Sequence, residues 1–536
     1  MYSRKDDVAR SNSNVFPNEK KYVIFLSVSD GKTRAIVTTG VAESMELAWL
    51  DAEKKCLQII NQQRMRPIWI KADVVINMKL QSKHTFFQTY HQVEKRHLRK
   101  GISLDRSFNL AFLEQELSAN VFLEEQSFSI DTMLDYLKTY RHYKERLRES
   151  DIKEIIIFDT VGVFCDKRNV YPLHSGGLSN GRRKVSVVDQ AIIQQMIDTA
   201  SIHLANKVKL TGEFSYDFNQ SDDIHRLFTH ASTIYAMIKA YAITKNPMLE
   251  KAIKRALNYL VHQKIVYRKH PEYGTVAYVV DKKKGYETAL GVIAITVIAI
   301  TMYEDIFNDQ SFRFMAESLG HGILSLQQDN GLFHHIVKVK DFNIKQAYRN
   351  AVYDEMTIYA LLKLYEVEHK DKWLNRALLS FDRFIEEKTE QPDYWLSYCA
   401  NEITKYRPED NYFTFCLQQM STNLADILKK ATSNPIYLEL LMSTEQLIQR
   451  IKGLQKEYLL EEYPVEYFTA TIHQRAKHQL DGYFFPELAM YMEEPQKVNG
   501  TFYIKNRSFR MKFDDIAHYI SSYHYYYQKV LQIKKD

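Results

Sequence analysis

The sequence predicts a mainly α-helical protein, an (α/α)6 toroid of six helical hairpins with a smaller N-terminal α/β domain. Glycine and proline are scarce, at 17 and 11 of 536 residues, which disfavours turn-dense β folds. From residue 185 onward, apolar residues recur at helical spacing nearly to the end of the chain. Tyr241, Tyr303 and Tyr365 follow one another at intervals of 62 residues, and each ends an apolar helical stretch, which indicates an internal repeat.

The first part of the chain has the mixed pattern of an α/β domain. Residues 1–20 are polar and are expected to form a disordered lead, and residues 21–183 are expected to form the domain. Its predicted elements are a hairpin at 21–39 with an Asp-Gly turn, a helix at 43–64, and buried strands at 68–76 and 154–164. The glycine-rich stretch 174–184 lacks the spacing of nucleotide-binding loops, so we interpret it as a linker.

Residues 185–536 are expected to form the toroid. If the first and last helices pair with each other, the helices form six hairpins that close into a ring of inner and outer helices, whereas an open solenoid is the alternative. The predicted helices are 187–207, 222–245, 248–263, 288–306, 310–327, 351–369, 372–387, 394–406, 409–430, 435–453, 463–479 and 513–532.

The connections between the hairpins carry a repeated Gly-x-Phe motif, at Gly212, Gly331, Gly482 and Gly500. A glycine permits a sharp turn after the outer helix, and the aromatic ring can pack back against the toroid. The longest connections all lead into inner helices, so they gather at the N-terminal ends of those helices. Functional sites commonly lie where long loops cluster on a rigid scaffold.

This arrangement resembles the six-hairpin glycosidase superfamily, which includes glycoside hydrolases, phosphorylases and sugar epimerases. The resemblance covers about residues 185–536 and rests on the repeat and the Gly-x-Phe turns, not on a catalytic signature. The N-terminal domain resembles no family in this way. The resemblance implies a sugar site at the N-terminal ends of the inner helices.

Carboxylates near these helix starts are the candidate catalytic groups. Asp354 and Glu355 lie inside an otherwise apolar helical pattern, and a partner could come from Asp217, Glu287 or Asp393. Glycoside cleavage needs one carboxylic acid to protonate the leaving oxygen and a second carboxylate as base or nucleophile. The alternative is that acidic residues at helix starts merely cap exposed backbone N–H groups.

Other polar and aromatic residues at the same helix starts are candidates for substrate binding. Aromatic rings stack on the C–H faces of sugars, and an epimerase would use His230 or His518 in acid/base chemistry. His230 can also be interpreted as a hydrogen-bonded core histidine. The substrate-binding candidates are His230, Arg349, Trp395, Tyr398, Asp514 and His518.

Composition and motifs give no indication of nucleic-acid binding, membrane spanning or metal binding. The net charge of +6 gives no reason to expect a nucleic-acid partner, and the apolar stretch 290–302 is too short to span a membrane. The four cysteines show no ligand spacing, and the adjacent His334 and His335 would point to opposite sides of a strand, so no metal or cofactor is expected.

The sequence analysis therefore favours a carbohydrate-active enzyme, with hydrolysis preferred over epimerisation. The absence of an export signal in the sequence suggests a cytoplasmic location and a role in cell-envelope glycan metabolism. The alternative is a non-catalytic sugar-binding or scaffold protein that acts beside a glycosyltransferase or polymer-assembly partner.

Overall fold

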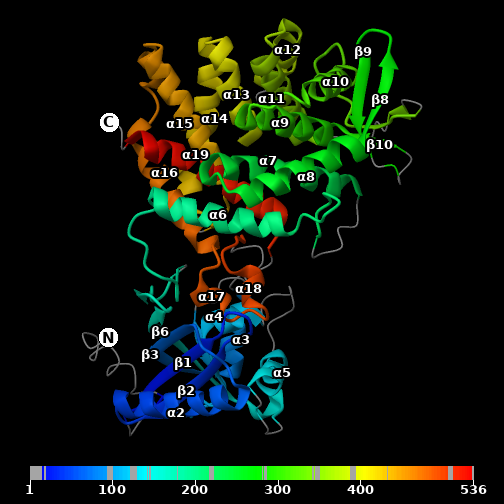
Figure 1. The fold of residues 1–536 in the computed structure, drawn as a ribbon. Helices are drawn as coiled ribbons and strands as arrows, with labels where there is room; N and C mark the ends of the chain where they lie inside the picture. The colour runs from blue at the N-terminus through cyan, green and yellow to red at the C-terminus, as the bar shows by residue number, and fades with distance from the viewer. Residues whose placement is uncertain are drawn as a thin grey trace. The chain divides into compact units, whose positions relative to one another are not determined.

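A computed structural model describes the chain in two compact units (Figure 1). Unit 1 consists of Met1–Val187, Ala431–Ser433 and Leu480–Met511, and unit 2 of Val188–Lys430, Asn434–Gln479 and Lys512–Asp536. The sequence analysis assigned all of 185–536 to the toroid, whereas Leu480–Met511 packs within unit 1. The structure describes all residues except 1–14, 17–19, 93–99, 121–129, 142, 144–146, 178, 217–222, 281, 283–285, 341–342, 345–349, 387–393, 431, 505–510 and 534–536.

Unit 1 is built on an antiparallel sheet with the strand order β2-β1-β3-β6-β4-β5, and β7 pairs with β6. The predicted hairpin is present, but it pairs Tyr22 with Ala42 and Val28 with Ile36, so its connection is longer than a two-residue turn. The strands are β1 Tyr22–Ser29, β2 Ile36–Ala42, β3 Trp69–Ser82, β4 Gly101–Ser103, β5 Ala111–Phe112, β6 Glu154–Cys165 and β7 Val170–Pro172.

The helices of unit 1 include the one predicted at 43–64. This helix, α2, begins after Ser44, whose side chain accepts a hydrogen bond from the backbone N–H of Leu47, and it packs on β1 and β2. The helices are α2 Met45–Gln63, α3 Lys83–Gln92, α4 Glu114–Asn120, α5 Ile130–Tyr140, α17 Pro486–Ala489 and α18 Pro495–Val498.

Two residues of the predicted disordered lead, Val15 and Phe16, are packed in the structure. Most of residues 1–20 lie outside the described residues, but Val15 is fully buried in the core of unit 1, and Phe16 packs against the same core. A buried apolar side chain anchors this segment to the sheet.

Long-range contacts hold the segment 480–511 in unit 1. The Glu487 carboxylate, fully buried, accepts hydrogen bonds from the Arg183 guanidinium at 2.7 and 2.9 Å, and the Tyr491 hydroxyl donates to Ser27 Oγ at 2.9 Å. Arg182 is buried too, with 6 % exposure, so the stretch 174–184 is a packed part of unit 1 and not a simple linker. Periodicity could not reveal these contacts, because they join residues 304 and 464 positions apart.

Unit 2 is a closed double ring, as predicted. Each inner helix contacts the next, and the last inner helix, α19, contacts the first, α7, so the ring closes and the open solenoid is wrong. The inner helices are α7 Asp223–Thr244, α9 Leu290–Phe307, α11 Ala351–Glu368, α13 Tyr394–Tyr406, α15 Ile436–Gly453 and α19 Phe513–Ile533.

The outer helices surround this ring. The first of them, α6, packs against both α7 and α19, so the first and last helices of the toroid do pair. Leu257, Leu319 and Phe381, which the repeat places in register, are all fully buried on outer helices. The outer helices are α6 Gln190–Asn206, α8 Pro247–Lys264, α10 Arg313–Leu324, α12 Asp371–Glu386, α14 Asp410–Lys429 and α16 Val465–Gln479.

The connections before α9 and α11 contain strands that the sequence analysis did not predict. One is a two-stranded hairpin, and the other is a three-stranded sheet in the order β10-β11-β12 at the N-terminal ends of α9 and α11. These strands are β8 Ile265–His270, β9 Gly274–Val279, β10 Glu287–Ala289, β11 Ile336–Lys338 and β12 Asn343–Ile344.

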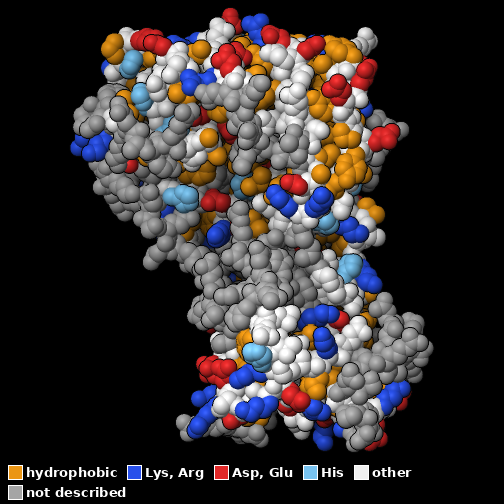
Figure 2. Space-filling model, turned by 180° about the vertical axis from the view of Figure 1, so that it is seen from behind, with side chains coloured by type: hydrophobic (Ala, Val, Ile, Leu, Met, Phe, Trp, Pro, Cys, Tyr) orange, Lys and Arg blue, Asp and Glu red, His pale blue; other side chains and the backbone are white. Residues whose placement is uncertain are grey.

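Helix α9 is longer than the apolar stretch at 290–302. By length and composition alone its 18 residues could cross a membrane, but 78 % of them are buried inside the structure. An inner helix of a toroid is covered on all sides, which accounts for its apolar sequence. On the face shown in Figure 2, Lys and Arg side chains are interspersed with Asp and Glu.

Candidate functional site

The N-terminal ends of the inner helices border a cavity of about 60 Å³, which we call the N-terminal cavity. Four of the predicted site residues line it, namely Trp395, Tyr398, Asp514 and His518. Glu439 of α15 also lines it, and this residue was not predicted. Its volume suffices for a hydroxyl group or one or two water molecules, but not for a whole sugar ring.

Glu439 joins two of these residues. One of its carboxylate oxygens accepts a hydrogen bond from the Tyr398 hydroxyl at 2.6 Å, and the other lies 2.8 Å from His518 Nδ1. Glu439 is 2 % exposed, whereas 28 % of the His518 side chain is exposed. Burial would lower the pKa of His518, but the carboxylates of Glu439, Asp514 and Asp515 raise it above its ordinary value.

The orientation of the His518 ring follows from this pairing. Because Nδ1 faces a carboxylate, it carries a proton, and Nε2 has no hydrogen-bond partner among the described residues. His518 therefore combines a raised pKa with an available ring nitrogen beside a cavity. These are the properties of a group that can donate or accept a proton.

Asp354 forms a second carboxylate–histidine pair, in the first turn of α11. Its Oδ1 lies 2.9 Å from His335 Nε2, and both residues are nearly fully buried. His335 Nδ1 accepts a hydrogen bond from the backbone N–H of Asn350 at 2.8 Å. Since both ring nitrogens are used, His335 orients Asp354, a role that was not predicted from the sequence.

Two other predicted catalytic residues are buried nearby. Glu355 is 3 % exposed, and its backbone carbonyl accepts a hydrogen bond from Cys399 Sγ. Glu287 is 7 % exposed and lies in β10, opposite Lys338 of β11. Neither residue lines the N-terminal cavity.

His230 does not lie at the predicted site. Its Nε2 is 3.1 Å from the backbone carbonyl of Ala256 on the outer helix α8, and its ring meets Phe214 edge to face. Burial lowers the pKa of His230 to about 4, so the ring is neutral near pH 7. The structure thus corrects the substrate-binding assignment, because His230 packs between an inner and an outer helix as a core residue.

Three predicted residues, Asp217, Arg349 and Asp393, lie outside the described residues. Asp514 accepts a hydrogen bond from the Thr229 hydroxyl at 3.4 Å and lines the N-terminal cavity.

A much larger cavity lies at the opposite, C-terminal ends of the inner helices. It has a volume of about 1200 Å³, and all six inner helices contribute to its lining. We call it the C-terminal cavity. Tyr235 and Lys239 of α7 line both this cavity and the N-terminal one, so they lie between the two.

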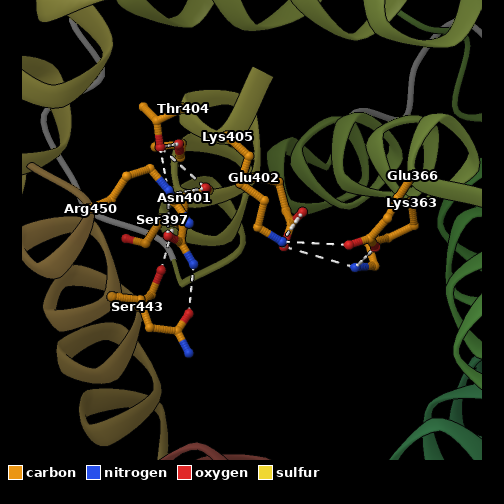
Figure 3. Close-up of polar contacts among 11 residues, drawn as sticks. Lys363, Glu366, Ser397, Asn401, Glu402, Thr404, Lys405, Ser443 and Arg450 are labelled. Atoms are coloured by element: carbon orange, nitrogen blue, oxygen red, sulfur yellow. Dashed lines mark hydrogen bonds and ion pairs between the residues drawn. The ribbon is translucent and has the colours of Figure 1, made fainter. Parts of the chain in front are cut away.

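An ion-pair network covers one wall of the C-terminal cavity (Figure 3). The Lys405 ammonium lies 2.7 Å from Glu402 and 3.6 Å from Glu366, and Lys363 pairs with Glu366 and lies 3.8 Å from Glu402. Burial would lower the pKa of Lys363, but these two carboxylates raise it above its ordinary value. The same ammonium groups help to lower the pKa of Glu366, which burial alone would raise.

Two of the residues that sequence reasoning missed had a signal in the sequence. Glu439 lies in the otherwise apolar start of the fifth inner helix, the same signal that identified Asp354 in the third. His335 is the second residue after a Gly-x-Phe motif, in a connection that leads to an inner helix. The residues of the C-terminal cavity lie on helix ends joined by short turns, where no long loop pointed to them.

The order of the helices and the contacts between them define unit 2 as an (α/α)6 toroid. No family model matches the chain, and neither does any curated protein.

Several solved structures are similar in fold. Cellobiose 2-epimerase from Bacillus thermoamylovorans is 13 % identical over 63 % of this chain and 99 % of its own, with a TM-score of 0.47. D-mannose isomerase is 11 % identical over 65 % of this chain and 100 % of its own, with a TM-score of 0.45. An α-1,6-mannanase from a Salegentibacter species is 13 % identical over 63 % of this chain and 99 % of its own, with a TM-score of 0.42. Identities this low do not transfer an activity to this chain.

No group of three or more His, Cys, Asp or Glu residues in the part of the chain that the structure describes is placed to hold a metal ion.

Proposed function

We propose that unit 2 is a carbohydrate-active enzyme that performs acid/base chemistry on a sugar or oligosaccharide at the N-terminal ends of its inner helices. The observation that supports this most is the His518–Glu439 pair. It lies beside a cavity that Trp395 and Tyr398 also line. A titratable group that can transfer a proton, next to aromatic rings that can pack on a sugar, suits acid/base chemistry on a carbohydrate.

Within this class we propose hydrolysis of a glycosidic bond. His518 gives its proton to the leaving oxygen, and Glu439 stabilises the protonated ring. Asp354, oriented by His335, takes a proton from the water that attacks the sugar carbon, so water is added across the broken bond. The N-terminal cavity receives a hydroxyl group of the bound sugar, which leaves the ring outside it.

Turnover of a sugar panel tests this proposal. Oligosaccharides and nucleotide sugars are screened by thermal shift, and those that stabilise the protein are analysed for products by chromatography. H518Q and D354N are expected to bind the same ligand and to convert it about 10²- to 10⁴-fold more slowly, because each lacks a proton-transfer group. H225Q, which alters an exposed histidine of α7, serves as the matched control and is expected to retain full turnover.

A second candidate is epimerisation or isomerisation of a sugar. It is favoured by the fact that the group with the available ring nitrogen is a histidine, which can remove a proton from carbon near neutral pH. The panel separates the two reactions, since an epimerase releases an isomer of the same mass and a hydrolase releases shorter sugars. Binding without conversion by any of the proteins would refute the enzyme proposal and favour a scaffold that acts beside a glycan-assembly partner.

A further inference from the structure

The C-terminal cavity takes no part in the proposed reaction. Most of its residues lie in the C-terminal halves of the inner helices, whereas Asp354 lies in the first turn of α11 and His518 in the second turn of α19. Its volume of about 1200 Å³ exceeds that of a typical small-molecule pocket, roughly 300 to 1,000 Å³. A cavity of this size has room for several sugar rings.

Three of the acidic residues that line this cavity are already paired with lysines. Glu366 and Glu402 pair with lysines in the network of Figure 3, and Glu445 pairs with Lys529 of α19. The remaining acidic residue of the lining, Asp305, is exposed. A cationic ligand would therefore have to displace lysines to reach the carboxylates of Glu366, Glu402 and Glu445.

Two cations of the lining have no such partner. Neither Lys239 nor Arg450 has a carboxylate within 4.0 Å among the described residues. Lys239 is 1 % exposed, and its ammonium group lies 3.2 Å from Ser521 Oγ and 4.1 Å from the centre of the Tyr235 ring. A buried ammonium held only by a hydroxyl and aromatic rings leaves a charge that an anion can neutralise.

Arg450 presents the geometry for such an anion. Its Nη1 donates to Thr404 Oγ1 at 2.8 Å and to Asn401 Oδ1 at 2.7 Å, as well as to the Asn401 carbonyl, and these bonds fix the guanidinium plane. Its Nε and Nη2 make no hydrogen bond to the described residues. These two groups form the edge that binds a carboxylate or phosphate through two parallel hydrogen bonds.

The rest of the lining suits a sugar. Tyr359 and Tyr525 provide aromatic rings, and the amides of Gln446 and Gln528 can bond to hydroxyl groups. We propose that the C-terminal cavity is a second carbohydrate site, which binds an oligosaccharide bearing a carboxylate or phosphate group that pairs with Arg450 and Lys239.

Calorimetric titration of the full-length protein tests this site. The ligands are tetragalacturonic acid, a mannose oligosaccharide with a terminal phosphate, and maltotetraose as the neutral reference. At least one anionic oligosaccharide is expected to bind, at least tenfold more tightly than maltotetraose, and to lose tenfold or more of its affinity in R450Q and in K239M. Which of the two anionic oligosaccharides binds identifies the anionic group.

Two further variants separate this site from the N-terminal one. K452Q removes a charge from an exposed position on the same helix as Arg450 and is expected to bind like the parent. H518Q, which impairs the proposed reaction, is also expected to leave this binding unchanged. The proposal is overturned if neither anionic oligosaccharide binds, if maltotetraose binds equally well, or if folded R450Q and K239M keep the parent affinity.

Discussion

At the residue scale, His518 and Glu439 couple the candidate site to the pH of the solution. Burial would lower the pKa of His518, but the carboxylates of Glu439, Asp514 and Asp515 outweigh this effect, so this pKa lies above its ordinary value of 6.5 in the folded chain. A raised folded-state pKa means that the pair stabilises the fold fully below the unfolded-state pKa, and that this stabilisation is lost as the pH rises through the folded-state value.

Chemical denaturation across the pH range checks this expectation. The free energy of unfolding of the parent should exceed that of H518Q most at about pH 5.5, and the difference should shrink toward about pH 8.5. H524Q is a control for which the free energy of unfolding should depend on pH in the opposite direction, because burial lowers the pKa of His524 to about 3. Only the unfolded chain takes up that proton, so the parent should lose stability relative to H524Q as the pH falls below about 6.5. A difference for H518Q that is independent of pH would contradict the assigned pair.

At the scale of helices and turns, the repeated tyrosines form hydrogen bonds that tie the inner helix of a hairpin to its outer helix. The Tyr241 hydroxyl donates to Glu250 at 3.1 Å, and the Tyr303 hydroxyl donates to Asp309 at 2.9 Å. In both hairpins a tyrosine near the end of the inner helix is tied to an acidic residue at or just before the start of the outer helix. The interval of 62 residues from Tyr241 to Tyr303 therefore joins equivalent corners of two successive hairpins.

The glycine of a Gly-x-Phe turn is expected to be important for the stability of the fold. Gly331 has φ of +83°, and a Cβ atom there would lie 2.7 Å from the carbonyl oxygen of Leu379. G331A is therefore expected to lower the free energy of unfolding by about 2 kcal/mol or more, from backbone strain and a steric clash together. Gly274 has φ of +70° with no atom within 4 Å, so G274A measures the strain alone and should cost about 1 kcal/mol. Thermal and urea unfolding of both variants measures the difference, and equal losses would mean that the clash is relieved.

At the scale of the whole molecule, unit 1 is assembled from distant parts of the chain. The segment 480–511 adds Phe484, Met490 and Tyr491, all fully buried, to the core of the sheet. Without this segment the Arg183 guanidinium would lose its buried partner, a change that typically costs about 3 to 5 kcal/mol.

A fragment experiment tests this composition. Residues 1–187 alone are expected to show no cooperative unfolding transition in urea, because the core is incomplete. The same fragment joined to residues 480–511 through a long Gly/Ser linker is expected to unfold cooperatively. Replacing Glu487 by Ala in the joined fragment should abolish or sharply weaken that transition, whereas an exposed control, Glu494→Ala, should not. Cooperative unfolding of 1–187 alone would show that the segment is dispensable.

The twelve helices of unit 2, their division into inner and outer rings, and the strands β1, β3 and β6 could be predicted from the sequence. These features arise from the periodicity of apolar residues, which local geometry sets. The sequence also identified Trp395, Tyr398, Asp514 and His518, because polar residues near the starts of inner helices must gather once the ring closes.

Which side chains pair with each other could not be predicted from the sequence and is seen only in the tertiary structure. Glu439 meets His518 across 79 positions, Asp354 is held by His335, and His230 turns toward an outer helix instead of the site. The tertiary structure also shows that residues 480–511 pack in unit 1 and that a cavity lies at the C-terminal ends of the inner helices. Such contacts join residues that are far apart in the sequence and that meet only when the ring or the sheet forms. Local sequence patterns do not show which of these residues will be neighbours.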